Sequence, residues 1–179
     1  STLSPSSAAS DVYKRQINSG NGAVDSGDDK PEPSTIPIST IVTSSGYRYT
    51  SKYISNIAVG TDVSNVKSAI EAVGGNATVA IFDAKGNAKT SGLIATGDKV
   101  SINNQSETEV LEVIIKGDTS GDGVINALDL LQVQKNILGT YTLTGAYLEA
   151  ADTSKDGVVN ALDLLQVQKN ILGTFEIEQ

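Results

Sequence analysis

Two acidic segments of the chain have the residue types and the spacing of a metal site built from oxygen ligands. The first covers residues 118–129 and reads DTSGDGVINALD, and the second covers residues 152–163 and reads DTSKDGVVNALD. In a twelve-residue calcium loop, oxygens at positions one, three, five, seven, nine and twelve surround the ion, and glycine at position six allows a sharp turn. Both segments meet these requirements, so the sequence predicts two calcium ions.

The predicted ligands occupy the same positions in both loops. They are Asp118, Ser120, Asp122, the Val124 carbonyl, Asn126 and Asp129 in loop one, and Asp152, Ser154, Asp156, the Val158 carbonyl, Asn160 and Asp163 in loop two. These EF-hand-like loops end in aspartate where many EF-hands have glutamate, and their neutral serine predicts weaker binding. One such segment alone could be a surface turn, but the duplication favours calcium. We expect metal binding to be coupled to folding, because the carboxylates repel one another without an ion.

Each loop leads into an apolar segment with helical periodicity, and loop and segment are duplicated together. Residues 117–141 and 151–175 differ at four of 25 aligned positions. The spacing predicts two helices with core stripes at Leu130, Val133 and Ile137 and at Leu164, Val167 and Ile171.

A second row of side chains overlaps each core stripe. It consists of Leu128, Leu131, Lys135 and Leu138 in the first copy and of Leu162, Leu165, Lys169 and Leu172 in the second. Two short helices cannot bury both rows, so we expect part of the second row to be exposed to a partner. The alternative is that these leucines pack internally.

The elements before the loops are predicted to form a small α+β module, rich in β-strands, over residues 38–116. An N-cap at Thr61 or Asp62 and a glycine pair at 74–75 delimit a predicted helix over residues 63–73. Strands are predicted within 46–57 and over 78–82, 93–95, 99–102 and 109–115, and a short helix over 144–150. This module contains no constellation of reactive side chains, so a structural or spacer role is favoured over an enzyme.

The composition argues against several kinds of function. The net charge of −8 argues against a nucleic-acid partner, which needs a basic surface. The absence of Cys and His removes the usual zinc sites, thiol and histidine nucleophiles and Ser-His-Asp triads. No run approaches the roughly 20 apolar residues that span a bilayer, so no membrane segment is expected.

The N-terminal segment is not expected to be part of the fold. Ser6–Gln16 (SSAASDVYKRQ) resembles a translated sequencing adapter, and residues 1–16 are therefore set aside. A natural linker rich in serine and alanine is the alternative. Residues 17–37 are rich in Gly, Ser, Asp and Pro and are predicted to be a flexible linker. A signal peptide or a catalytic module is expected to have preceded this linker.

The duplicated loop and helix resemble the dockerin modules of bacterial cellulosomes. The resemblance covers residues 117–175, leaving 176–179 as a tail, and rests on the repeated pattern D-T-S-x-D-G-V-x-N-A-L-D-L-L and the I-L-G that closes each helix. It implies an all-α dockerin fold that binds calcium and a cohesin module of a scaffoldin or cell-surface protein. It also implies an extracellular location, where the module anchors an upstream protein to a multi-enzyme scaffold for polysaccharide degradation, such as a cellulosome. The preceding unit is similar to the small β-rich modules that adjoin dockerins.

The resemblance also implies which side chains contact the cohesin. They are Ala127, Leu128, Gln134 and Lys135 in the first copy and Ala161, Leu162, Gln168 and Lys169 in the second, and the second rows add Leu131 and Leu165. Because these residues are the same in both copies, either copy could face the cohesin after a half-turn of the module. We expect a non-catalytic monomer. The alternative is a calcium-stabilised adhesive or carbohydrate-binding module, although a chain without Trp offers few surfaces for sugar stacking.

Overall fold

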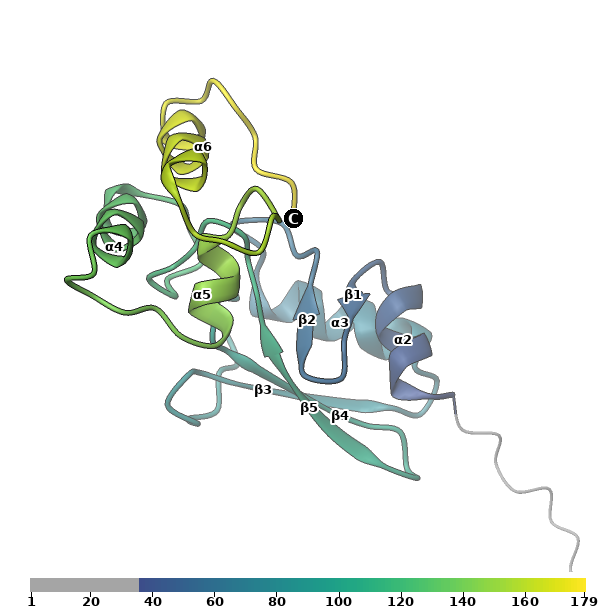
Figure 1. The fold of residues 1–179 in the computed structure, drawn as a ribbon. Helices are drawn as coiled ribbons and strands as arrows, with labels where there is room; N and C mark the ends of the chain where they lie inside the picture. Colours follow the sequence, from purple (N-terminus) through teal and green to yellow (C-terminus); the bar gives the residue numbers. More distant parts are fainter. Residues whose placement is uncertain (1–35) are drawn as a thin grey trace, which may run out of the picture. The chain divides into compact units, whose positions relative to one another are not determined.

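A five-stranded mixed sheet forms the first part of the structure, a computed structural model that describes residues 36–179 (Figure 1). Its strands are β1 (Arg48–Tyr49), β2 (Tyr53–Ser55), β3 (Thr78–Phe82), β4 (Lys99–Asn103) and β5 (Thr108–Val113). They lie in the order β1-β2-β5-β4-β3, with β2 and β5 parallel and the other neighbours antiparallel. The predicted strands at 78–82, 99–102 and 109–115 are confirmed within a residue or two at their ends.

One face of this sheet is apolar because buried and exposed side chains alternate along each strand. Val100 and Ile102 of β4 are buried, for example, whereas Asn103 is exposed. Helices α2 (Ile38–Ser44) and α3 (Val63–Val73) pack on that face, and their apolar side chains share one core with those of the strands. The predicted helix over residues 63–73 is confirmed with its bounds.

The sequence analysis did not find helix α2. Its sequence, ISTIVTS, is rich in β-branched residues, which disfavour a helix. The helix nevertheless buries Ile38, Ile41 and Val42, at positions i, i+3 and i+4. It begins after Pro37, whose carbonyl accepts hydrogen bonds from the amides of Thr40 and Ile41. Burial against the sheet therefore outweighs the intrinsic propensity of the segment.

The predicted strand over residues 93–95 is wrong. This segment pairs with the start of α3 instead of with the sheet: the Ile94 amide donates to the Thr61 carbonyl at 2.8 Å, and the Val63 amide donates to the Gly92 carbonyl at 2.9 Å. Only Leu93 forms an isolated bridge, with Asp62. The segment Leu93–Gly97 thus forms a buried connection that runs toward loop one.

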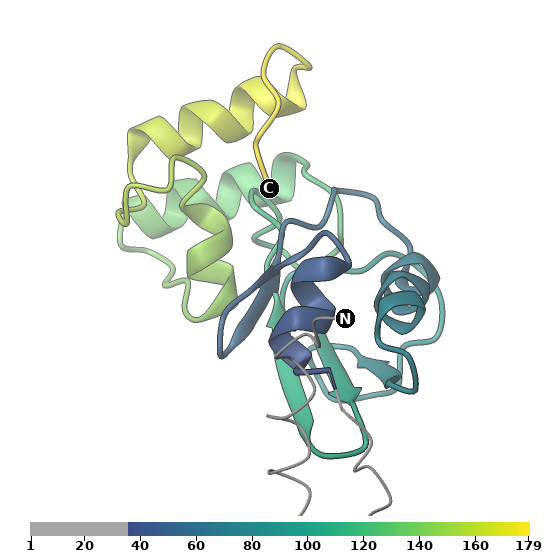
Figure 2. The same cartoon turned by 90° about the vertical axis from the view of Figure 1, so that its right-hand side faces the viewer.

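The second part of the structure contains α4 (Ala127–Ile137), α5 (Ala146–Ala151) and α6 (Ala161–Ile171). Helices α4 and α6 pack on each other, and Figure 2 shows them one above the other. Their small core contains the buried side chains of Val133, Val167, Leu143 and Ile177. All three helices were predicted from the sequence to within two residues at each end.

Part of each predicted core stripe is not buried. Val133 and Val167 are fully buried and Leu130 and Leu164 are partly buried, but Ile137 and Ile171 are both 39% exposed. The prediction for these two isoleucines is wrong because Leu143 and Ile177, from the segments that follow the helices, complete the core. Helical periodicity does not reveal such side chains.

The sheet part and the helical part lie within one compact unit that begins at Thr35. The expected adapter remnant (1–16) and nearly all of the expected linker (17–37) lie outside the described residues. Within the described range, no helix has the length and apolar character that crossing a membrane requires.

Candidate metal centre and partner face

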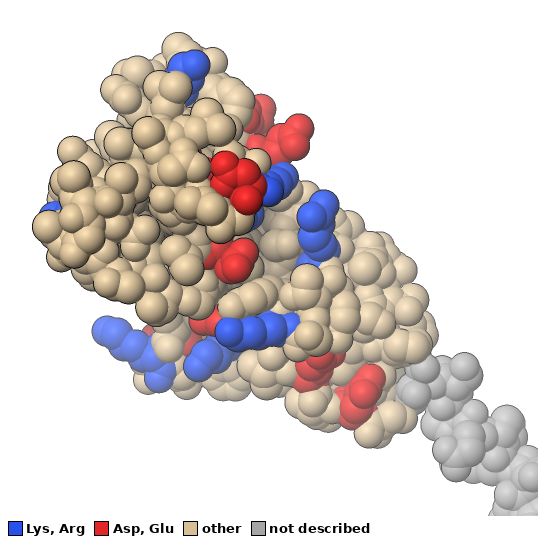
Figure 3. Space-filling model, in the orientation of Figure 1, with Lys and Arg blue, Asp and Glu red and all other residues tan. Residues whose placement is uncertain are grey.

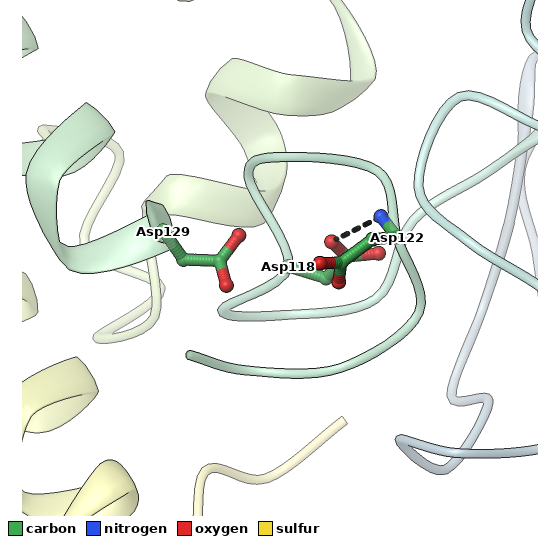
Figure 4. A group of neighbouring side chains, drawn as sticks. All are labelled: Asp118, Asp122 and Asp129. Carbon is green, nitrogen blue, oxygen red and sulfur yellow. Dashed lines mark hydrogen bonds between the residues drawn. The ribbon is translucent and has the colours of Figure 1, made fainter. Parts of the chain in front are cut away.

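Loop one brings three carboxylates together. One oxygen from each of Asp118, Asp122 and Asp129 lies within 4.8 Å of the other two (Figure 4). Asp118 lies shortly after β5, and Asp129 lies in the first turn of α4, so the end of a strand and the start of a helix converge on the site. Asp118 and Asp129 are fully buried, whereas Asp122 is exposed.

Backbone amides hold the carboxylate of Asp118. Its Oδ1 accepts from the amides of Gly121 at 2.8 Å and Asp122 at 3.1 Å, and its Oδ2 accepts from those of Gly123 at 3.1 Å and Thr96 at 2.9 Å. Burial raises the pKa of the Asp118 carboxyl, and the amides of Thr96, Gly123 and Gly121 act in the opposite direction, toward the charged form.

Asp129 combines a place in the cluster with the capping of α4. Its Oδ1 accepts from the Ser120 amide at 2.7 Å, and its Oδ2 accepts from the Asn126 amide at 2.8 Å. The Asn126 side chain in turn accepts from the Leu128 amide at 2.7 Å, which completes a capping box at the helix start. The positive end of the helix dipole also favours a carboxylate at this position. The Asp129 carboxylate thus links the amide of Ser120 in the loop to the amide of Asn126 at the start of α4.

The donor set of loop one fits a hard cation. All the predicted ligands are oxygens, which calcium prefers in proteins. The hydroxyl oxygen of Ser120 is buried and makes no hydrogen bond within the described part of the chain, so this predicted ligand lacks a protein partner. Calcium would supply the positive charge that three adjoining carboxylates need, and the residues of loop one would hold it.

Loop two has the same backbone pattern but a looser arrangement of carboxylates. Asp163 accepts from the amides of Ser154 and Asn160, both at 2.8 Å, and caps α6 as Asp129 caps α4. Among the described residues, however, Asp152, Asp156 and Asp163 do not gather within the distance that groups the loop-one aspartates.

Two predicted ligands of loop two already have partners within the protein. The Ser154 hydroxyl donates to Asp152 at 3.4 Å, and the Asn160 amide group donates to the Val158 carbonyl at 3.0 Å. Asn126 of loop one makes a similar contact, with Asp122 at 2.9 Å, so the wider spacing of the carboxylates is the main difference, and the second calcium site remains a prediction.

The predicted partner-binding residues are exposed on both helices. Leu128 and Leu162 are 49% and 47% exposed, and Leu131 and Leu165 are 43% and 44% exposed. The remaining predicted contacts are exposed as well: Ala127, Gln134, Lys135, Ala161, Gln168 and Lys169. The internal-packing alternative for these leucines is therefore wrong. The two sets of side chains are hereafter called the α4 face and the α6 face.

Few charged side chains lie over α4 and α6 on the side of the molecule that Figure 3 shows. Figure 3 shows that the surface over α4 and α6 is mostly uncharged in this view, whereas Lys, Arg, Asp and Glu gather near the junction with the sheet and over the sheet itself. Depletion of charged residues is typical of the core of a protein-binding site.

Lys116 supports loop two from the junction between the two parts. Its ammonium group donates to the backbone carbonyls of Glu149 and Asp152, at the end of α5. Burial lowers the pKa of this lysine. The side chain of Gln179 bonds both the amide and the carbonyl of Lys116, at 2.8 and 3.2 Å. No sequence motif marks Lys116, Gln179 or Thr96 as neighbours of a loop.

Residues 116–172 match the family model of the dockerin type I domain, so this part of the chain is a dockerin module. Type I dockerins generally bind calcium and bind cohesins in cellulosome-type assemblies, and they occur in secreted components. The match does not include the sheet. No curated protein matches the chain, and no solved structure matches it.

Proposed function

We propose that the dockerin module binds a cohesin in a calcium-dependent manner and so anchors the protein to an extracellular scaffold. The observation that carries this proposal is the matched exposure of the leucines on the α4 and α6 faces. Several exposed leucines gathered on each of two equivalent helices favour an interaction site over isolated surface exposure. The module acts through binding and performs no catalysis.

Calcium acts on the partner face through the capping aspartates. Asp129 is both a predicted ligand and part of the capping box of α4, and Leu128 lies one residue before it. An ion held by loop one would therefore fix the start of the helix that presents the α4 face. Asp163 and Leu162 have the same relationship on α6.

Two equivalent faces allow two orientations of the bound cohesin. The predicted contact residues are identical in both copies, and their exposures differ by only one or two percentage points for the paired leucines. The faces would bind alternatively, with the module turned by half a rotation between them.

A binding assay against a panel of cohesins tests this function. The unmodified chain should bind at least one cohesin in calcium and lose that binding with a chelator. Replacing Leu128 and Lys135 by alanine should lower affinity about twofold, since one of two equivalent modes remains. Replacing Leu162 and Lys169 as well should abolish binding. Titration calorimetry measures each step.

Leu148→Ala is the matched control, because Leu148 is 40% exposed but lies on α5, away from both faces. It should bind as the unmodified chain does. Binding that survives the fourfold replacement, or that is unaffected by the chelator, would contradict the proposal. Complete loss of binding after replacement of Leu128 and Lys135 alone would be consistent with cohesin binding as the function. It would show that the cohesin binds in a single orientation.

A further inference from the structure

Backbone groups of the sheet part form hydrogen bonds with loop one, and no such bonds reach the carboxylates of loop two among the described residues. The Thr96 amide donates to the Asp118 carboxylate at 2.9 Å, and the Gly60 amide donates to the Gly123 carbonyl at 3.0 Å. Thr96 and Gly60 both precede β5 and lie outside the dockerin match. Asp152 is the counterpart of Asp118, and among the described residues its carboxylate accepts hydrogen bonds only from loop two. The Lys116 ammonium group donates to the Asp152 backbone carbonyl and not to the carboxylate.

Thr96 is held rigidly in its place. It is buried, and its hydroxyl donates to the Ile115 carbonyl at 3.2 Å and accepts from the Ile115 amide at 3.1 Å. Ile115 lies three residues before Asp118, so the side chain of Thr96 fixes the approach to loop one while its amide contacts the ligand itself. A buried donor that cannot rotate away orients a carboxylate better than water does.

The differences between the two copies reflect this contact. Gly121 corresponds to Lys155, and a Cβ at Gly121 would lie 2.8 Å from the Thr96 carbonyl oxygen, closer than any side chain tolerates. Lys155 has space in loop two: it adopts a φ of 62° and its ammonium group lies 3.8 Å from the Glu178 carboxylate. Lysine tolerates a similar positive φ in loop two, so the close approach of Thr96 adds a steric requirement for glycine at position 121 beyond the loop conformation.

A second glycine pair leads to the same conclusion. Both loops need glycine at the sixth position for the turn, and both glycines have positive φ. A Cβ at Gly123 would lie 2.6 Å from the Ile94 carbonyl oxygen, whereas one at Gly157 would meet nothing within 4 Å. The backbone of residues 94–96, hereafter called the wall segment, thus closely covers loop one.

We propose that the wall segment is part of the first calcium site, so that the sheet part of the protein raises the affinity of loop one above that of loop two. This inference rests on the proposal that the loops bind calcium. The Thr96 amide is a positioning group: it orients the Asp118 carboxylate and shields it from water. Outer hydrogen bonds of this kind are worth about 10–100-fold in metal affinity.

The proposal is tested on two versions of the full chain that each keep one site. Asp156→Ala removes a ligand side chain from loop two, so that the remaining calcium binding reports on loop one, and Asp122→Ala does the reverse. Both aspartates are exposed, so neither change disturbs a core. Titration calorimetry with calcium should give a dissociation constant for loop one that is at least about tenfold lower than that for loop two.

Gly121→Lys then gives loop one the residue that loop two carries. It should weaken calcium at loop one about tenfold or more, because the side chain displaces the wall segment, and leave loop two within about twofold. Lys155→Gly is the matched control and should change neither site by more than about twofold. Thr96→Val keeps the loop sequence but removes the hydroxyl that anchors the wall, and it should also weaken loop one alone.

Circular dichroism with excess calcium checks that each variant is folded. If Gly121→Lys does not fold, the calcium affinity of Thr96→Val decides the test. Equal affinities of the two loops, or a Gly121→Lys effect matched by Lys155→Gly, would overturn this inference and leave cohesin binding intact. The absence of calcium binding at both loops would overturn the calcium dependence of the proposed function together with it.

Discussion

Single aspartates in this protein serve the fold and the proposed metal site together. Asp129 accepts hydrogen bonds from the amides of Ser120 and Asn126 and also belongs to the cluster of three carboxylates. Its buried position makes those hydrogen bonds valuable, because an unpaired buried amide costs about 1–3 kcal/mol. Asp122 differs, since it is exposed and bonds only within the loop.

Asp129→Ala should therefore lower the stability of the metal-free protein by about 2–4 kcal/mol, because two amide donors lose their acceptor and the helix loses its cap. Asp122→Ala should change metal-free stability by less than about 1 kcal/mol while still weakening calcium binding at loop one. Urea unfolding in a chelator measures both values. Equal stability losses for the two variants would show that Asp129 has no structural role beyond that of Asp122.

Helices α4 and α6 divide their apolar residues between a core and a surface. Val133 and Val167 are fully buried between the helices, whereas Leu138 and Leu172 are 67% exposed. The core of the dockerin part is small, so each buried valine represents a large share of its apolar burial. The leucines contribute little to the fold and are free to contact a partner.

Val133→Ala should destabilise the protein by about 1.5–3 kcal/mol through the lost methyl groups and the cavity that remains. Val167→Ala should have an effect of the same size, since the two residues are equivalent. Leu138→Ala, the surface control, should stay within about 0.5 kcal/mol. Thermal or urea unfolding in calcium gives these values, and a larger effect at Leu138 than at Val133 would contradict the observed packing.

At the scale of the whole molecule, the sheet and the dockerin module share one compact unit. The contacts that join them are specific: Thr96 with Asp118, Gly60 with Gly123, and the Tyr147 ring, which lies against Gly97 and Gly121. A ligand that binds only the folded state stabilises everything that unfolds with its site.

Calorimetry of the full chain should therefore show one main unfolding transition, and calcium should raise the temperature of that whole transition. At a free calcium concentration of 100 times the dissociation constant, the gain is about 2.7 kcal/mol for each ion. Circular dichroism in the far ultraviolet and tyrosine absorption should report the same midpoint. Two separate transitions, of which calcium moves only one, would show that the sheet and the dockerin module unfold independently.

Features that depend on neighbours in the sequence could be predicted from the sequence. The ends of α3, α4 and α6 follow from helical spacing and flanking glycines, although the Asp62 side chain makes no capping hydrogen bond at α3. Asp129 and Asp163 follow from the loop pattern as predicted ligands, and only the structure revealed that they also cap α4 and α6. The exposed leucines of both faces follow from having two apolar rows on short helices. Helix α2 and the path of residues 93–95 could not be found this way, because long-range burial and pairing outweigh the preferences of those segments.

The sequence by itself determined the duplicated helices, the predicted oxygen ligands of both loops and the leucines exposed on the α4 and α6 faces, because each is encoded within about a dozen consecutive residues. Only the tertiary structure distinguished the two loops. Their ligands are identical in type, but Asp118 meets the Thr96 amide, from a segment 22 residues earlier, and Asp152 does not. Packing between distant segments decides such contacts. In the sequence, the contact with Thr96 corresponds to glycine at position 121, where loop two has Lys155.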